Sequence, residues 1–300
     1  LVEAIESSGM KISPQKPPEK GDNADYPGSR LSNPAIEFKG VSFGYAEQPV
    51  LENLNLSAQQ NELLAIVGQN GSGKSTLASL CNGIEQPDSG TVFVDGIPTG
   101  DYSFEKLVRR VAYIFQVPEK QFVCSTVYDE IAHGLRTLGV EQDEIEQQTV
   151  KLLGTVRLLD RRDASPYVLS HGQKRRLSVA AMVVSKPKVV ILDEPTFGQD
   201  YQQAQNLMQM LRDLANEGAS VIFITHDMRL VAEYADRVAV LCDGKIIFNG
   251  QPEELFTTEE VLLRARLKPP SVAQFSARLL GYPVLTTQAL IERIQGVSGG

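Results

Sequence analysis

The sequence lacks a hydrophobic run long enough to cross a membrane. Its longest apolar runs, Val179–Val184 and Val189–Leu192, are far shorter than the ~18 residues that a membrane-spanning helix requires. It also lacks the basic and then apolar start of a secretory leader, because its first residues are mixed polar and acidic. We therefore expect no membrane-spanning segment and no export signal within these 300 residues.

The sequence also has few cysteines and no excess of basic residues. The three cysteines are scattered, without a C-x-x-C pair or a neighbouring histidine: Cys81, Cys124 and Cys242. This pattern excludes a disulfide scaffold and a zinc cluster and fits a reducing compartment, so we interpret them as small buried residues. Acidic residues number 37 against 29 basic ones, which gives a net charge of −8 and argues against nucleic acid as a partner.

What the sequence does contain is material for a folded core. Hydrophobic residues make up 42% of the chain, too many for a disordered protein. Residues 12–34 are rich in Pro, Gly, Ser, Asn and Asp, so we interpret them as a linker, preceded by a short helical stub at Leu1–Met10. A compact domain is expected over residues 35–250, and a mixed helical extension over residues 251–300.

Apolar segments rich in β-branched residues alternate with helical patterns across the compact domain. Short runs typical of strands buried on both faces are Leu63–Val67, Val111–Phe115, Val189–Leu192 and Val221–Thr225. Asp243-Gly244 predicts a hairpin turn, and residues 118–186 are mostly helical. These signals predict an α/β fold whose core sheet is mostly parallel, with an antiparallel β part and a helical subdomain over about residues 118–186.

A phosphate-binding loop follows the first of these buried runs. The segment fits G-x-x-x-x-G-K-[ST] and opens a helix; its residues are Gly68, Gln69, Asn70, Gly71, Ser72, Gly73, Lys74, Ser75 and Thr76. The glycines let backbone N–H groups converge on phosphate oxygens, and the helix N-terminus adds its positive end. Lys74 is expected to reach the β- and γ-phosphates, and the Ser75 hydroxyl to bind Mg²⁺. ATP and Mg²⁺ are the expected ligands.

A pair of acidic residues follows the run Val189–Leu192. At a strand's C-terminal end Asp193 can hold the Mg²⁺ shell, while Glu194 can polarise a water for in-line attack on phosphate. Two further polar residues also follow buried strands: Gln116, expected near the γ-phosphate and the metal, and His226, expected to hydrogen-bond a phosphate oxygen. Tyr45, upstream of the loop, presents an aromatic face on which a purine can stack.

The segment Leu169–Gln173 resembles the LSGGQ signature of ABC ATPases. Its residues Ser170, His171, Gly172 and Gln173 follow the phosphate loop and precede Asp193-Glu194 and His226 in that family's order, so residues 35 to about 250 resemble an ABC transporter ATP-binding domain. The resemblance implies a head-to-tail pair of such domains, with each ATP held between one phosphate loop and the opposite signature. It also implies an integral membrane partner and a peripheral location on the cytoplasmic face of the cell membrane, with Glu194, His226 and Gln116 in catalytic roles.

Two features near the signature need their own interpretation. His171 replaces the usual first glycine, which costs energy if the backbone there needs a positive φ, although histidine tolerates that region better than most residues. We interpret the basic run Lys174-Arg175-Arg176 as a solvated helix face. His171 therefore leaves open the rate of hydrolysis of the nucleotide that faces this signature from the opposite domain. It does not bear on nucleotide binding by this chain.

A finer resemblance concerns the segments Phe115–Phe122 and Thr126–Leu135. They are similar to the FQNP-x-x-Q and TV-x-x-(D/E)-(I/V)-A-x-G patterns of energy-coupling-factor (ECF) ATPases, which drive vitamin and transition-metal uptake. Leu169–Gln173 together with Thr196–Asp200 further resembles the second half of duplicated ATPases for hydroxymethylpyrimidine (HMP)/thiamine-type uptake. This resemblance implies that residues 1–34 are the tail of a preceding domain followed by a linker, which would explain the start at Leu1 without methionine. An exporter ATPase and a nucleotide-gated regulatory half remain alternatives, and the transported substrate stays open.

Overall fold

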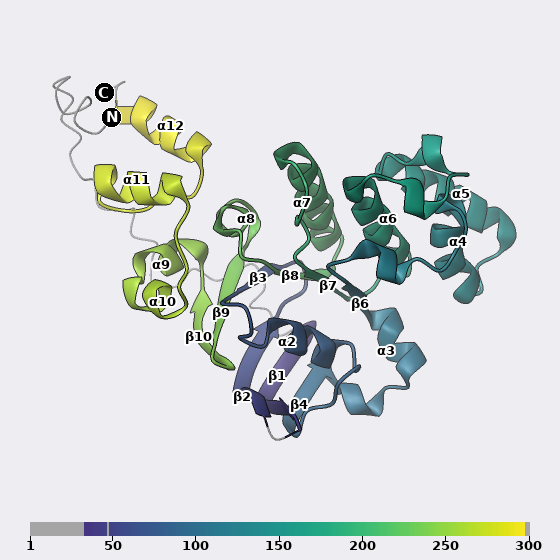
Figure 1. Cartoon of the computed structure of the whole chain (residues 1–300), viewed down its shortest axis with the longest axis horizontal. Coiled ribbons are helices and arrows are strands. Elements are labelled where there is room, and N and C mark those ends of the chain that lie inside the picture. The colour runs from purple at the N-terminus through teal and green to yellow at the C-terminus, as the bar shows by residue number, and fades with distance from the viewer. Residues whose placement is uncertain (1–32, 47, 298–300) are drawn as a thin grey trace.

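The computed structural model describes residues 33–46 and 48–297. The expected tail and linker over residues 1–34 lie outside these described residues, apart from Asn33 and Pro34. A six-stranded sheet runs through the middle of the molecule (Figure 1). Its strands, in spatial order, are β10 (Lys245–Gly250), β9 (Arg237–Cys242), β3 (Leu63–Val67), β8 (Ser220–Ile224), β7 (Val189–Asp193) and β6 (Val111–Ile114).

The central sheet is mostly parallel, as the sequence predicts. Strands β9, β3, β8, β7 and β6 pair in parallel, and β10 joins β9 as an antiparallel edge. The β9–β10 turn has positive φ at both Asp243 (48°) and Gly244 (74°), which is the backbone that a two-residue hairpin of this kind requires. The predicted run Val111–Phe115 is one residue too long, because β6 ends at Ile114 and Phe115 is 37% exposed.

Each central strand contributes to two hydrophobic cores. Along β3, Leu64 and Ile66 pack into the core on one side of the sheet, whereas Leu63, Ala65 and Val67 pack into the core on the other side. This alternation follows from the two-residue period of a strand. Because both faces of β3 are buried, its sequence is a continuous apolar run. The sheet is therefore the middle layer of the domain.

The first core lies between the central sheet and a smaller antiparallel sheet. That sheet has the order β2 (Gln48–Ala58), β1 (Ile36–Tyr45), β4 (Ser89–Val94) and β5 (Ile97–Pro98), and α2 (Lys74–Cys81) packs with it on the same side. The second core lies under α7 (Tyr201–Asn216) and α8 (Met228–Tyr234). Figure 1 shows α2 and the small sheet on one side of the central sheet and α7 and α8 on the other.

Two helical groups flank these layers at opposite ends (Figure 1). Beyond β6 lies the predicted helical subdomain, with its own small cores; its helices are α4 (Val127–Thr137), α5 (Gln142–Thr155) and α6 (His171–Val183), and α3 (Phe104–Arg110) lies between β5 and β6 in the chain. Beyond β10 lies the C-terminal extension, made of α9 (Pro252–Thr257), α10 (Glu259–Arg264), α11 (Ser271–Leu280) and α12 (Thr287–Val297).

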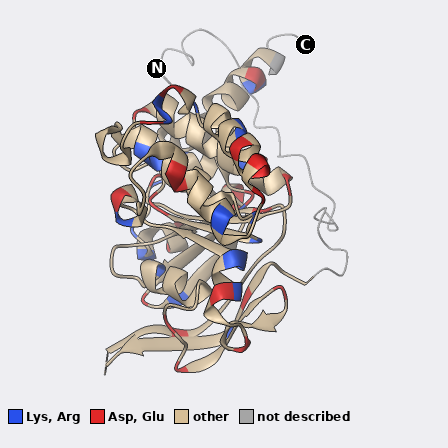
Figure 2. Ribbon diagram, turned by 90° about the vertical axis from the view of Figure 1, so that its right-hand side faces the viewer, with Lys and Arg blue, Asp and Glu red and all other residues tan. Residues whose placement is uncertain are grey.

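Charged residues of both signs are interspersed along the chain (Figure 2). No helix among the described residues is long and apolar enough to span a membrane. Two cysteines, Cys81 and Cys242, are buried as expected, whereas Cys124 is only half-buried, so the expectation was wrong for Cys124. Its segment connects the end of β6 to α4 and is fastened by the buried Glu130, whose carboxylate accepts hydrogen bonds from the backbone of Val123 and Cys124.

Candidate functional site

A cleft of about 610 Å³ opens over the phosphate loop. It brings together ten of the residues that the sequence analysis singled out: Asn70, Gly71, Gly73, Lys74, Ser75, Thr76, Gln116, Asp193, Glu194 and His226. These residues come from the C-terminal ends of four parallel strands and from the start of α2. Parallel strands place their carboxyl ends at one edge of a sheet, which is why residues far apart in the chain meet here.

Two glycines of the loop, Gly68 and Gly73, are required by its close packing. A Cβ on Gly68 would lie 2.0 Å from the Leu241 carbonyl oxygen, so no other residue fits without a shift of the backbone. Gly73 caps α2 with a φ of 103°, and a Cβ there would lie 2.7 Å from Leu51 Cδ2. The loop is thus packed against β2 and β9. Because its glycines have no side chains, its backbone N–H groups can approach a ligand directly.

Lys74 is positioned by the carbonyl groups of its own loop. Its Nζ donates to the carbonyl oxygens of Gly68 at 2.9 Å and Gln69 at 2.7 Å. Burial lowers the pKa of Lys74 below its ordinary value of 10.5, and the nearby carboxylates of Glu194 and Asp193 oppose that shift. An ammonium has three protons to donate, so one remains for a ligand oxygen in the cleft.

Ser75 and Asp193 form the part of the cleft suited to a divalent cation. Ser75 Oγ donates to Asp193 Oδ2 at 2.9 Å, although the two residues are 118 positions apart in the chain. Gln116, in the same cleft, adds an amide oxygen. All three donors are hard oxygens, the class that Mg²⁺ prefers, and few protein ligands suffice because this ion keeps most of its other positions for water and phosphate. The donor set therefore fits the predicted Mg²⁺.

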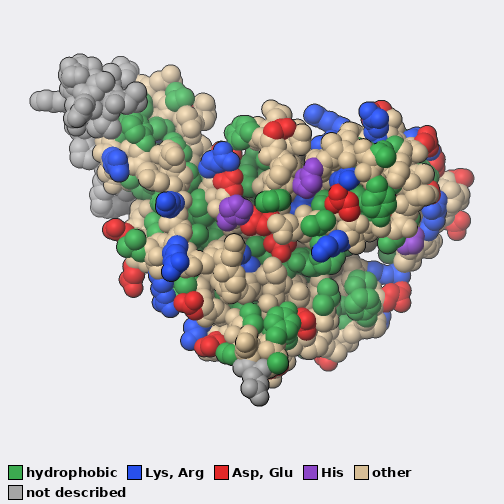
Figure 3. Space-filling view, viewed as in Figure 1, with side chains coloured by type: hydrophobic (Ala, Val, Ile, Leu, Met, Phe, Trp, Pro, Cys, Tyr) green, Lys and Arg blue, Asp and Glu red, His purple; other side chains and the backbone are tan. Residues whose placement is uncertain are grey.

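Glu194 and His226 form the part of the cleft suited to proton transfer. His226 Nδ1 lies 2.8 Å from Glu194 Oε1, a distance at which an Nδ1–H proton would be donated to the carboxylate. Glu194 is mostly buried, whereas His226 is largely exposed. Figure 3 shows acidic and histidine side chains next to each other near the middle of one face of the molecule. A carboxylate that is held in this way can accept a proton from a water.

The backbone at Glu194 has an unusual conformation. Its φ is +45°, in the left-handed region that non-glycine residues rarely occupy, at a cost of roughly 1–3 kcal/mol. The surrounding structure over-determines this turn: Glu194 N donates to the Ile224 carbonyl oxygen at 3.0 Å, and the Glu194 carbonyl oxygen accepts from Phe197 N at 3.2 Å. The backbone thus turns sharply at the residue whose carboxylate enters the cleft.

The remaining predicted residues lie outside the cleft. Tyr45 is 49% exposed and packs edge-on against Phe43, with ring centroids 4.9 Å apart. Gly68, Gln69 and Ser72 belong to the loop but do not line the cleft. The aromatic ring of Tyr45 is therefore accessible on the surface, but it does not line the cleft.

The signature residues lie at the start of α6. Ser170 caps this helix and exchanges hydrogen bonds with Gln173, so the two form a capping box. His171 is exposed and is the first residue of the helix; it is not among the residues with positive φ, so the backbone at this position does not require glycine. Gly172 is buried, and a Cβ there would lie 2.1 Å from Gln203 Oε1.

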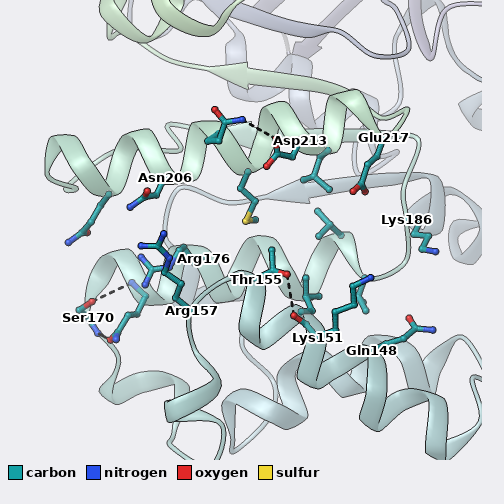
Figure 4. Close-up of a pocket in the computed structure, with 18 residues that line it drawn as sticks. Gln148, Lys151, Thr155, Arg157, Ser170, Arg176, Lys186, Asn206, Asp213 and Glu217 are labelled. Atoms are coloured by element: carbon teal, nitrogen blue, oxygen red, sulfur yellow. Dashed lines mark hydrogen bonds between the residues drawn. The ribbon is translucent and has the colours of Figure 1, made fainter.

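A second cavity of about 890 Å³, here called the groove, begins at this signature and runs between α5, α6 and α7 (Figure 4). Ser170 and Gln173 lie at its lining. Basic side chains come from the helical subdomain and the segment that follows α6, and acidic ones come from α7; the labelled charged residues are Lys151, Arg157, Arg176, Lys186, Asp213 and Glu217. The signature and the phosphate loop are thus in separate cavities.

The interpretation of Lys174-Arg175-Arg176 as a solvated face was wrong for Arg175. Arg175 is 1% exposed and is the largest of the fully buried side chains. Lys174 is mostly buried as well and pairs with Glu119 at 2.9 Å. Helical spacing could have revealed Arg175, because it lies three residues after Gly172 and three before Ser178, both on the buried stripe of α6.

Comparisons with known proteins agree with this geometry. The family described as ABC transporter matches residues 51–197. An energy-coupling factor transporter ATP-binding protein of Methanothermobacter thermautotrophicus is 34% identical, over 88% of each chain. A putative HMP/thiamine import ATP-binding protein of Bacillus subtilis is 40% identical, over 81% of this chain and 44% of that protein. The solved structure of cbiO1 from Clostridium perfringens, described as part of the ABC transporter complex cbiONQ, has a TM-score of 0.71 at 33% identity and covers 81% of this chain and 98% of that one.

The relatives differ in length. This chain spans about half the length of several curated proteins that it matches, but most of the length of others. The matched segment includes the phosphate loop, Gln116, the signature and Asp193-Glu194.

Proposed function

The chain belongs to the ATP-binding proteins of ABC transporters, of the energy-coupling-factor type, and we propose on this premise that it hydrolyses ATP to energise the uptake of a vitamin or a metal ion. The observation that carries the proposal is the cleft itself. A lysine, a hydroxyl–carboxylate pair and a glutamate–histidine pair converge there on one volume of about 610 Å³. These are the groups that phosphate binding, metal binding and water activation require.

Each group has a distinct role in the proposed reaction. The loop N–H groups and Lys74 bind and orient the β- and γ-phosphates. Mg²⁺, bound by Ser75 and Asp193 with Gln116 close by, would neutralise charge on the phosphate oxygens. Glu194 accepts a proton from the attacking water, and His226 holds the carboxylate through Nδ1 and binds a phosphate oxygen. The adenine ring would stack on the exposed face of Tyr45.

A second ABC domain completes the site in this proposal. Ser170 and the N–H groups at the start of α6 would contact the γ-phosphate bound to the partner's phosphate loop, as a helix N-terminus favours an anion. The separation of the cleft and the groove supports this arrangement, because one chain cannot bring its own signature to its own phosphate loop without a large rearrangement. The partner domain is either a second copy or a different domain, in the same parent chain or in another.

The membrane subunit is proposed to dock at the segment Gln116–Phe122, on the cytoplasmic face of the cell membrane. Exposed apolar side chains lie within this segment and on both sides of it: Val117 is 44% exposed, Phe115 37% and Val123 73%. Exposed apolar side chains close together in a segment are a typical protein interface. The segment also carries Gln116, so a partner seated there would contact the loop that reaches the cleft.

Domain limits and substrate class belong to the same proposal. We assign residues 35–250 to the ATP-binding domain, residues 1–34 to a tail and linker, and residues 251–300 to a C-terminal extension. The similarity to a protein named for HMP/thiamine import and to a cbiONQ component supports vitamin or metal uptake. An ATP-binding domain does not touch the transported substrate, so the choice between them requires the membrane subunit.

The test is Mg-ATP hydrolysis by this chain over a range of protein concentrations, with Glu194→Gln measured in parallel. We expect specific activity to rise with concentration, because two chains must pair, and to fall at least about 100-fold in Glu194→Gln, as the loss of a general base predicts. ATP binding should persist in that variant. If hydrolysis continues unchanged in Glu194→Gln, the proposed mechanism is wrong. If the wild type binds ATP but never hydrolyses it alone, it needs a different partner domain or its membrane subunit.

A further inference from the structure

Arg175 is a buried cation whose hydrogen-bond partners in the described residues are all backbone carbonyl groups. Nε donates to the Pro195 carbonyl oxygen at 2.9 Å, and Nη2 donates to those of Asp193 at 2.7 Å and Glu194 at 2.9 Å. Nη1 donates to the carbonyl oxygen of Phe115. No carboxylate forms an ion pair with it in the part of the chain that the structure describes. A guanidinium has five donors in a fixed plane, and here four carbonyl oxygens accept from them.

These four carbonyl groups belong to the two segments that supply the chemistry of the cleft. Asp193, Glu194 and Pro195 form the turn after β7, and Phe115 immediately precedes Gln116 after β6. Arg175 itself belongs to α6, so one side chain of the signature helix joins the ends of two neighbouring strands. Arg175 therefore adds a side-chain link between the segments of Gln116 and Glu194 to the parallel pairing of β6 and β7.

The strained backbone of Glu194 explains why such a fork is needed. The carbonyl groups on both sides of the Glu194 Cα, its own and that of Asp193, accept from the same nitrogen, Nη2. In this turn Glu194 has a φ of +45°, and both carbonyl oxygens lie within hydrogen-bond distance of that nitrogen. A left-handed non-glycine residue persists where its surroundings over-determine it, and this pair of hydrogen bonds provides that constraint.

We propose that Arg175 is a positioning residue for ATP hydrolysis, which holds Glu194 in its left-handed turn and fixes the separation of Glu194 and Gln116. The inference rests on the proposed function. Burial lowers the pKa of Arg175 to about 10, while Asp193 and Glu194 act to raise it, so the guanidinium stays protonated near neutral pH. Arg175 binds neither nucleotide nor metal, and it acts only through the segments that it ties together.

The substitutions that test this are Arg175→Lys and Arg175→Gln. Lysine keeps the charge but has three donors on one nitrogen, so it cannot reach four carbonyl groups at once. We expect kcat to fall about 10-fold in Arg175→Lys and about 100-fold in Arg175→Gln, the range for losing one or two hydrogen bonds to a charged group. ATP affinity, measured separately, should change by less than about 3-fold because the phosphate loop is untouched.

Arg176→Gln is the matched control. Arg176 is the next residue of the same helix, and its Nε donates to the Val156 carbonyl oxygen at 2.9 Å, away from β6 and β7. Loss of this charge should leave kcat within about 3-fold of the wild type, as expected of a polar contact remote from the reacting atoms. An equal loss of kcat in both variants would assign the effect to α6 as a whole and overturn the proposal.

A double variant separates positioning from general damage to the fold. The Glu194→Gln variant has no carboxylate for Arg175 to position. Adding Arg175→Lys to it should therefore reduce the residual rate of hydrolysis by less than about 2-fold. A structural defect would instead multiply with the loss from Glu194→Gln. Full multiplication, or wild-type kcat in both single variants, would overturn the proposal.

Hydrogen exchange gives a readout that does not depend on activity. The Phe197 amide donates to the Glu194 carbonyl oxygen within the turn, and the Glu194 amide donates to the Ile224 carbonyl oxygen at the end of β8. In both Arg175 variants these two amides should exchange at least about 10-fold faster, while amides of β3 keep their wild-type rates. This measurement decides the positioning role even if the wild-type chain hydrolyses no ATP by itself, so a failure of the positioning role and a failure of the proposed hydrolysis give different results. Unchanged exchange at residues 194–197 in the folded Arg175→Lys variant would show that Arg175 does not hold the turn.

Discussion

The cleft over the phosphate loop and the groove between α5, α6 and α7 differ in how their charged side chains are paired. In the cleft, Lys74, Asp193 and Glu194 each have a hydrogen-bond partner within the site. In the groove, basic and acidic residues line a larger cavity, and no ion pair joins them in the described part of the chain (Figure 4). A site whose groups are already fixed has little reorganisation left to undergo when its ligand arrives. The charged groups of the cleft are therefore hydrogen-bonded within their own site, whereas Arg176 and Asp213 of the groove are hydrogen-bonded to neutral groups rather than to each other.

The largest effect should come from removing the one ammonium of the cleft. Lys74→Ala leaves the phosphate oxygens without a charged donor in a partly buried site, so ATP affinity should fall about 100- to 1,000-fold. Titration of a fluorescent ATP analogue measures this loss. Lys186→Ala, which removes an ammonium from the groove, is the control and should leave affinity unchanged. Comparable losses of ATP affinity in both variants would show that the cleft is not the distinct nucleotide site.

A smaller effect should follow from removing the histidine that contacts Glu194. His226→Leu deletes a hydrogen bond to a carboxylate, which predicts a loss of kcat of about 10- to 100-fold. His226→Asn can place an amide N–H near the position of Nδ1 and should recover part of that loss. Steady-state hydrolysis of the three proteins measures both changes. Equal rates for the leucine and asparagine variants would show that the contact with Glu194 is not what His226 contributes.

Sequence patterns predict the cleft well because its parts are locally encoded. A glycine loop before a helix, and polar residues directly after buried strands, are visible within a few positions of the chain, and parallel pairing then brings Ser75 and Asp193 together across 118 residues. Strands β2 and β4 were not predicted individually. Both are only partly buried, and their place in a sheet depends on pairing with β1, which no local pattern reveals.

Arg175 was missed for a different reason. A run of three basic residues favours a solvated face when charge alone is considered, but successive residues of a helix point in different directions. The carbonyl groups that satisfy Arg175 come from residues 18 to 60 positions away in the chain. Only the folded arrangement shows that a charge is accommodated there, because the acceptors are backbone atoms and leave no sequence signal.

The ion pair between Glu119 and Lys174 connects the cleft side of the molecule to the signature helix and should affect stability modestly. Lys174 Nζ lies 2.9 Å from Glu119 Oε1, and the hydrogen bond from Lys174, with one from the backbone, lowers the pKa of Glu119 below its ordinary value of 4.5. A carboxyl whose folded pKa is depressed stabilises the fold above its unfolded pKa, and that stability is lost as the pH falls through the folded value.

Glu119→Gln should therefore lower the free energy of unfolding near neutral pH by about 0.5–1 kcal/mol, discounted for the partial exposure of the pair. Well below pH 4.5 the variant and the wild type should converge, since the wild-type carboxyl is then protonated. Urea unfolding at both pH values measures the difference. Glu105→Gln, in an exposed i,i+4 pair with Arg109, is the control and should change stability by less than about 0.5 kcal/mol at either pH. A difference that persists unchanged in acid would mean that the ion pair is not its source.

The smallest effect should come from neutralising the acidic wall of the groove. Asp213 lies in the last turn of α7 and Glu217 is the residue that caps its C-terminal end, four positions later, so Asp213→Asn with Glu217→Gln removes a repulsion between them as well as an attraction to the basic wall. The two terms oppose each other, and both act between solvated groups, so the free energy of unfolding should change by less than about 0.5 kcal/mol. Whatever change remains should vanish at about 0.5 M salt, because screening acts on solvated charges but not on buried ones. A loss that resists salt would show that these carboxylates are desolvated and paired, and the groove would then be as fully organised as the cleft.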